Sequence, residues 1–134
     1  MLSLLAQNRG LSMLAVDYAD RARRICRDLD DRYGEAAAAL NLSLVLRRRG
    51  QLREAKRRAT EARKGFAAVG WRIGHCRATI ALGMIRRDGG DARGAVRLLR
   101  KAERIADADG YRRELCLARF AIGGIRLDQG MLSE

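Results

Sequence analysis

The fold is decided by residues 41–62, NLSLVLRRRGQLREAKRRATEA, in which Gly50 separates two stretches rich in helix-forming residues. The pattern recurs forty residues further along the chain as residues 81–102, ALGMIRRDGGDARGAVRLLRKA. Steps of forty from Gly50 also reach Gly10, Gly90 and Gly130. One glycine in every forty residues, between two helical stretches, predicts a repeat of helix, turn and helix.

Other columns of the forty-residue register support this repeat. An aliphatic column and a small-residue column precede the glycine, and three columns of mostly alanine follow it. Their members are Leu2, Leu42, Leu82 and Ile122; Ser3, Ser43, Gly83 and Gly123; Ala15, Ala55 and Ala95; Ala19, Ala59 and Leu99; and Ala22, Ala62 and Ala102. The last three columns are spaced by four and three residues, so they share one helical face, where small side chains allow helices to pack closely.

The absence of proline and the aromatic content of only 4% favour an all-α fold. Helices are expected near 2–9, 12–28, 32–49, 52–69, 72–88, 92–108 and 112–128, with a stub after Gly130. Besides the glycine turns, the chain should turn at Asp30-Asp31, Val69-Gly70 and Asp109-Gly110, where aspartate or glycine can cap a helix.

The 134 residues are expected to form a single repeat domain. It would consist of a partial unit 1–30, complete units 31–70 and 71–110, and a partial unit 111–134. Repeat arrays normally end in polar capping units, and neither end of this sequence resembles one. We therefore expect a fragment of a longer array, or a homo-oligomer in which another copy covers the uncapped ends.

The columns around the glycine resemble the signature of the tetratricopeptide repeat. The resemblance covers essentially the whole chain and implies a right-handed α-α superhelix, or solenoid, of antiparallel helix pairs. Two features depart from the family pattern: the period is forty instead of about thirty-four residues, and the proline that usually ends the second helix is missing. A lengthened second helix explains both, as in the long-repeat arrays of large bacterial transcription regulators. A HEAT or armadillo array is the alternative, although its first helix typically kinks at a proline.

The formal net charge of +12 suggests an acidic partner. Many arginines, such as Arg47, Arg48 and Arg49, lie at the predicted end of a first helix, where they offset the partial negative charge of the last carbonyls. No apolar run reaches the roughly 18 to 20 residues that span a bilayer, and the opening MLSLLAQNRG lacks the basic leader of a signal peptide. The chain is expected to be soluble and cytoplasmic, without a membrane partner.

Residues suited to catalysis or metal binding are scarce. His75, the only histidine, precedes Cys76 directly, and adjacent helical residues point apart, so the two cannot form a dyad. Cys26, Cys76 and Cys116 form no CxxC motif and are expected to be reduced, buried thiols. We therefore expect no enzyme, no cofactor and no metal site.

The family resemblance implies that the first helices line a concave groove that takes up a helix or extended segment of a partner. The groove residues implied in this chain are Leu40, Leu44, Arg47, Arg48, Arg77, Ile80, Met84, Arg87, Leu117 and Phe120. An apolar groove edged by arginines suits an amphipathic segment with acidic residues. The expected function is protein–protein interaction, with a partner protein or another part of the parent chain, in a bacterial regulatory protein.

Nucleic-acid binding is the alternative function. The basic stretches Lys56-Arg57-Arg58 and Arg63-Lys64 on the second helix of the second unit could follow phosphates. Against this alternative, the sequence has no recognition-helix motif and no aromatic residues interleaved with the basic ones as stacking platforms.

Overall fold

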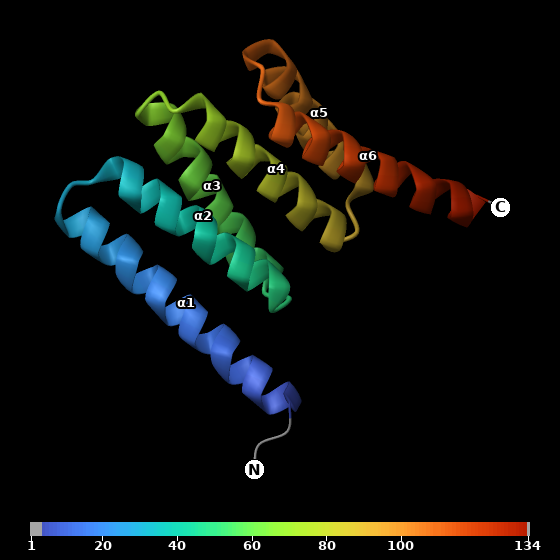
Figure 1. The fold of residues 1–134 in the computed structure, drawn as a ribbon. Helices are drawn as coiled ribbons and strands as arrows, with labels where there is room; N and C mark the ends of the chain where they lie inside the picture. Colours follow the sequence, from blue (N-terminus) through green and yellow to red (C-terminus); the bar gives the residue numbers. More distant parts are fainter. Residues whose placement is uncertain (1–3, 134) are drawn as a thin grey trace.

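The computed structural model describes residues 4–133, and the side chains of residues 9–130. In that range the chain forms six helices and no strand. They are α1 (Leu4–Asp28), α2 (Arg32–Arg48), α3 (Leu52–Ala68), α4 (Arg72–Asp88), α5 (Ala92–Asp109) and α6 (Arg112–Ser133). Each helix packs against the next one along the chain, and further contacts join α2 to α4 and α4 to α6. Figure 1 shows the resulting array, with α1 and α6 at its two ends. The prediction of an all-α helical repeat array is confirmed.

The turns between these helices share one residue with left-handed backbone geometry, and it recurs every twenty residues. These residues, with their φ angles, are Asp30 (56°), Gly50 (79°), Gly70 (74°), Gly90 (87°) and Gly110 (76°). Glycine adopts a positive φ without a steric penalty, and aspartate tolerates it better than most residues. The turns predicted at Gly50, at Gly90 and at the three junctions between units are therefore confirmed.

Gly10 and Gly130 do not form the predicted turns, because each lies inside a continuous helix, α1 or α6. The helices predicted at 2–9 and 12–28 are therefore one helix over their described part, and the stub after Gly130 continues α6. A glycine inside a helix costs only about 1 kcal/mol relative to alanine, so it does not by itself end one. Residues 2 and 3 of the predicted first helix, with their column members Leu2 and Ser3, lie outside the described residues.

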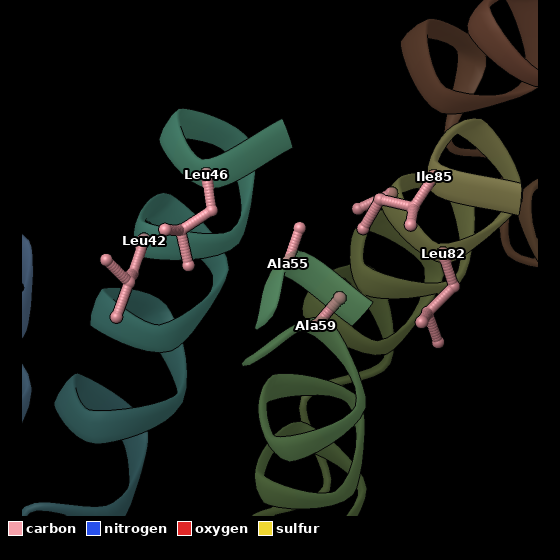
Figure 2. Packing of buried hydrophobic residues seen from close by; sticks show 7 residues of the cluster. Leu42, Leu46, Ala55, Ala59, Leu82 and Ile85 are labelled. Carbon is pink, nitrogen blue, oxygen red and sulfur yellow. The ribbon is translucent and has the colours of Figure 1, made fainter. Parts of the chain in front are cut away.

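The core runs along the array between successive helices. Figure 2 shows its central cluster, in which Leu42 of α2 and Leu82 of α4 lie on either side of Ala55 and Ala59 of α3. Both alanines are completely buried, so the alanine columns are what lets α3 lie close to α2 and α4. Gly83 serves the same purpose between α4 and α5, where an added Cβ would lie 2.8 Å from Leu99 Cγ.

The same columns are not buried at the two ends of the array. Ala15 and Ala22 of α1 are exposed, and a Cβ added at Gly123 of α6 would have no neighbouring atom within 4 Å. The close helix packing predicted for these columns is therefore absent at Ala15, Ala22 and Gly123, whereas Ala19 of α1 packs against the central cluster. Ile122, by contrast, is buried against α5 as its column predicts.

Candidate functional site

A groove of about 580 Å³ runs along α2, α4 and α6, the helices that stand first in the repeat units. It is lined by Leu40, Asn41, Leu44, Arg47, Arg48, Arg77, Ile80, Ala81, Met84, Arg113, Glu114 and Leu117. The structure thus brings together eight of the ten groove residues predicted from the sequence. The two that lie elsewhere are Arg87 and Phe120.

The apolar floor of the groove comes from residues one helical turn apart. Leu40 and Leu44 share a face of α2, and Ile80 and Met84 share the corresponding face of α4. Their inner atoms pack against the core clusters on either side of α4, which fixes their positions, while their outer atoms remain accessible. Leu117 of α6, 49% exposed, extends this apolar strip. The floor is therefore formed before any partner arrives.

Two arginines on the rim belong to ion pairs between neighbouring first helices. Arg47 Nε on α2 donates to Asp88 Oδ2 on α4 at 2.6 Å, and Arg77 Nε on α4 donates to Glu114 Oε1 on α6 at 3.0 Å. The side chain of Glu114 is only 5% exposed, so its charge depends on Arg77 for compensation. These two arginines hold the walls of the groove together, and their charge is already balanced.

Arg48 and Arg113 supply the positive charge that stays available. Both line the groove and are exposed, and neither forms an ion pair within the described part of the chain. The sequence analysis missed Arg113. No column of the repeat marks it, because the residues forty and eighty positions earlier are Ile73 and Tyr33.

Arg87 and Phe120 lie outside the groove for different reasons. Arg87 Nη2 lies 3.4 Å from Asp88 Oδ1, so this arginine is engaged beside the rim. Phe120 is 82% exposed and lies in a separate hollow of about 500 Å³ on α6, together with Cys116. Each stretch of the groove forms between two successive first helices, and no further helix follows α6 in the described residues to enclose Phe120.

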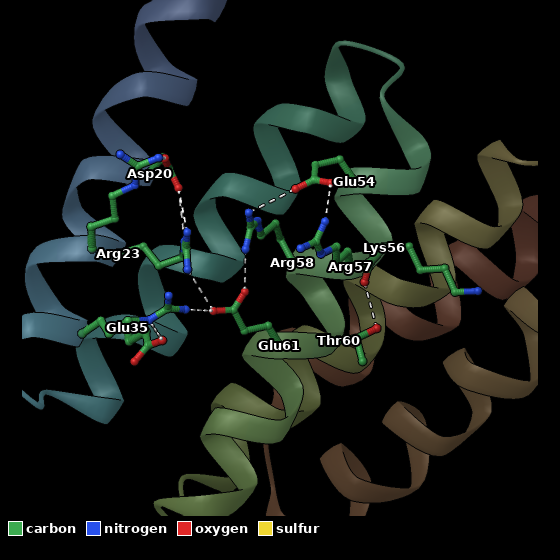
Figure 3. Close-up of polar contacts among 11 residues, drawn as sticks. Asp20, Arg23, Glu35, Glu54, Lys56, Arg57, Arg58, Thr60 and Glu61 are labelled. Atoms are coloured by element: carbon green, nitrogen blue, oxygen red, sulfur yellow. Dashed lines mark hydrogen bonds and ion pairs between the residues drawn. The ribbon is translucent and has the colours of Figure 1, made fainter.

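Part of the basic surface of α3 belongs to an ion-pair network, drawn in Figure 3. The carboxylate of Glu61 accepts hydrogen bonds from Arg58 at 3.0 Å, Arg23 at 3.3 Å and Arg27 at 3.4 Å. Arg23 and Arg27 belong to α1, so the network joins α1 to α3. Arg58 also pairs with Glu54 at 3.1 Å. Of the basic residues predicted for this surface, Arg57 and Arg58 are paired within α3, while Arg23 and Arg27 of α1 make the link between the two helices.

Other basic residues on α3 remain unpaired. Arg53, Lys56 and Lys64 line a shallow hollow of about 630 Å³, and they make no ion pair with the residues that the structure describes. Arg63, which the sequence analysis placed in the basic stripe, is half-buried instead. The free charge on this face is thus smaller than the run of basic residues suggests.

The cysteines and the histidine form no reactive group. Cys76 is buried, and burial, followed by the nearby carboxylates, raises its pKa to about 11. Cys26 is only half-buried and Cys116 is exposed, so the prediction of three buried thiols is wrong for these two. His75 Nδ1 lies 3.4 Å from the backbone carbonyl oxygen of Arg63. Within residues 9–130 no cluster of three or more His, Cys, Asp or Glu side chains could hold a metal ion.

The groove is the strongest candidate site in the described residues, since it combines three helices, a preformed apolar floor and unpaired cations. None of the helices, over the part of the chain described, is long and apolar enough to cross a membrane. Comparison with protein-family models gives no match for this chain, and comparison with curated proteins gives none either.

Proposed function

We propose that this chain is a non-catalytic protein-interaction module of the tetratricopeptide type, which binds an amphipathic, acidic helix or peptide in the groove along α2, α4 and α6. The observation that carries the proposal is the apolar floor of Leu40, Leu44, Ile80 and Met84, flanked by the unpaired Arg48. The likeness of the repeats to those of large bacterial transcription regulators supports a regulatory setting. The partner is then another protein or another segment of the parent chain.

The chemistry of the groove selects this kind of partner. Burial of aliphatic side chains on the floor contributes about 25 cal/mol for each Å² of apolar surface removed from water. Aliphatic residues spaced by three and four along a partner helix would meet this floor. Carboxylates on the partner's flank would meet Arg48 and Arg113, which favours one orientation and accelerates association at low salt.

Selection from a peptide-display library, followed by titration of the selected peptides, tests the proposal. We expect peptides with aliphatic residues at helical spacing and flanking Asp or Glu. The double substitution Leu44→Gln and Met84→Gln should weaken their binding at least tenfold, equivalent to about 1.4 kcal/mol. Val69→Gln, at an exposed apolar side chain outside the groove, is the matched control and should leave binding unchanged. Peptides that bind equally well to both variants would refute the groove as the site.

A short DNA duplex, titrated at two salt concentrations, tests the alternative. Three results together would assign the function to nucleic acid. Tight binding would weaken steeply as salt rises. It would be lost when Arg53, Lys56 and Lys64 are replaced by alanine, and it would survive the double substitution Leu44→Gln and Met84→Gln. We expect only weak duplex binding, because Arg57 and Arg58 are paired within α3 and the sequence has no recognition-helix motif and no aromatic residues interleaved with the basic ones.

A further inference from the structure

An apolar stripe runs along the side of α1 that faces away from α2. It consists of Leu11, Ala15, Tyr18, Ala22, Ile25 and Leu29, all of them exposed. The spacing of four and three residues places these side chains on one face of the helix. Tyr18 and Ile25 are 67% and 58% exposed, whereas Val16 and Ala19 pack against the core beside α2. The stripe extends over residues 11–29, and no described helix covers it.

A second uncovered stripe lies on α6, at the other end of the array (Figure 1). It consists of Cys116, Phe120, Gly123 and Leu127, again spaced by four and three residues and all exposed. Phe120 and Leu127 are 82% and 65% exposed. The opposite side of α6 is the one that packs against α5. Since α1 and α6 lie at opposite ends, the two stripes of one molecule cannot meet.

The contact between α4 and α5 shows how two such stripes fit together. A Cβ at Gly83 would lie 2.8 Å from Leu99 and 3.3 Å from the carbonyl oxygen of Ala95, and Cys76 Sγ lies 3.4 Å from the carbonyl oxygen of Ala102. In the forty-residue register, the α4 residues correspond to Gly123 and Cys116 of α6. In the same register, Leu99, Ala95 and Ala102 of α5 correspond to Ala19, Ala15 and Ala22 of α1. Small residues that permit close packing are thus present on both uncovered stripes, at Ala15 and Ala22 of α1 and at Cys116 and Gly123 of α6, and the half-buried Ala19 lies beside the α1 stripe.

We propose that the chain assembles head to tail, with α6 of one copy packed antiparallel against α1 of the next copy in the register of the α4–α5 contact. Gly123 then faces Ala15 and Ala19 of the neighbouring copy, and Cys116 faces Ala22. The two stripes are different surfaces, so the contact is heterologous, and each added copy leaves one stripe of each kind open. This assembly uses neither the floor nor the rim of the groove, and it does not depend on the proposed function.

The straight ends of the molecule fit this arrangement. Within the chain, α4 and α5 belong to one polypeptide and need the turn at Gly90 between them. Helices from two copies need no turn, and α1 and α6 run straight through Gly10 and Gly130. Two straight helices can pass one another and extend the contact beyond the length of a hairpin. Because each copy carries a formal charge of +12, salt should promote this assembly by screening the repulsion between copies.

Two variants, each blocking one stripe, test the proposal by light scattering at moderate salt. Tyr18→Arg blocks α1 and Gly123→Arg blocks α6, and both positions are open to solvent in the single molecule. We expect the mass of the unmodified chain to rise beyond a dimer with concentration, and each variant alone to stay monomeric. An equimolar mixture should form a 1:1 dimer and nothing larger, because one intact pair of stripes remains. Circular dichroism checks that both variants fold.

Other outcomes would overturn the proposal. An unmodified chain that stays monomeric at every concentration would refute the assembly. Association that survives Gly123→Arg would indicate a contact between two α1 helices instead. Association that survives Tyr18→Arg would indicate a contact between two α6 helices. Leu44→Gln with Met84→Gln in the groove should leave the assembly intact. A failure of the assembly is therefore distinguishable from a failure of the groove.

Disulfide trapping tests the register. Ala22→Cys in a Cys26→Ser background should give a covalent ladder of oligomers on mild oxidation, through Cys116 of the neighbouring copy. The ladder should disappear with reductant and with Cys116→Ser. Ala108→Cys in the same background is the matched control, since residue 108 is exposed on α5 and outside both stripes. No ladder from Ala22→Cys, or an equal ladder from the control, would refute the register.

Discussion

Alanine at Gly83 and alanine at Gly123 should change the stability of this chain in opposite directions, although both glycines occupy the same column of the repeat. At Gly83 the new Cβ would lie 2.8 Å from Cγ of Leu99, which is completely buried, and 3.3 Å from the carbonyl oxygen of Ala95. At Gly123 it would meet no atom within 4 Å. The two substitutions are chemically identical and differ only in whether a helix covers the site.

The magnitudes follow from two effects. Replacement of a helical glycine by alanine raises the free energy of unfolding by about 1 kcal/mol through helix propensity. At Gly123 nothing opposes this gain. At Gly83 the added methyl group overpacks the contact between α4 and α5, which costs about 1–3 kcal/mol. Because Leu99 has no free space and the backbone must also shift, we expect a net loss of about 1 kcal/mol.

Urea unfolding followed by circular dichroism, at a concentration where the chain is monomeric, measures both effects. The unfolding midpoint should rise for Gly123→Ala and fall for Gly83→Ala with an unchanged m-value, and each kcal/mol should shift Tm by about 2–5 °C. A destabilising Gly123→Ala would mean that another segment covers α6 in the single molecule. A stabilising Gly83→Ala would mean that α4 and α5 lie further apart than described.

Three further predictions concern the turns, the acid response and the thiols. Gly10→Ala should raise the free energy of unfolding by about 1 kcal/mol, because Gly10 lies inside α1. Gly50→Ala should lower the free energy of unfolding by about 1–2 kcal/mol, because the φ of Gly50 is +79°. Thermal unfolding of both variants measures the difference. Hydrogen bonds from the backbone N–H of Gly94 and then from Arg86 lower the pKa of Asp91 in the folded chain. The ionised Asp91 therefore contributes its full stabilisation above its unfolded pKa, and this contribution is lost as pH falls through the lower folded pKa. Asp91→Asn should therefore lose less stability than the unmodified chain between about pH 5 and pH 2, as urea titrations at both pH values would show. Iodoacetamide should modify the exposed Cys116 in the monomer and spare Cys76, whose pKa is about 11, until the chain unfolds, as peptide mass mapping would show.

The sequence was sufficient to predict the elements between residues 32 and 109 because several signals coincide there. At Gly90 a glycine with positive φ is followed by Asp91, whose side chain accepts a hydrogen bond from Gly94 N at 2.8 Å and caps α5. Gly10 and Gly130 are not followed by an aspartate, but the turns at Gly50 and Gly70 also form without a side-chain cap, at Gln51 and Trp71. The regular spacing of glycine was therefore not sufficient to predict a turn, and capping by aspartate accounts only for the starts of α2 and α5.

The groove was predictable in its apolar floor and less so in its charge. Leu40 and Leu44 follow from the repeat register together with the groove-facing phase that the resemblance to the tetratricopeptide repeat implies. The pairing of Arg47 with Asp88 and of Arg77 with Glu114 depends on how α2, α4 and α6 are placed in space. A column of arginines cannot indicate which of its members will find a carboxylate on the neighbouring helix.

The contacts between neighbouring helices also bear on how this chain reaches its native state. Over the described residues, helices pack against consecutive helices, or α2 against α4 and α4 against α6, and the ion pairs of Arg23 and Arg27 with Glu61 add a link from α1 to α3. Such a chain has a low contact order, so folding can begin at any adjacent pair and spread in both directions without the closure of long loops. Amide hydrogens of the four inner helices, α2 to α5, which have neighbours on both sides, should then exchange with solvent last, and those of α1 and α6 first. A copy bound at either end would slow exchange at that end and leave the opposite end unchanged.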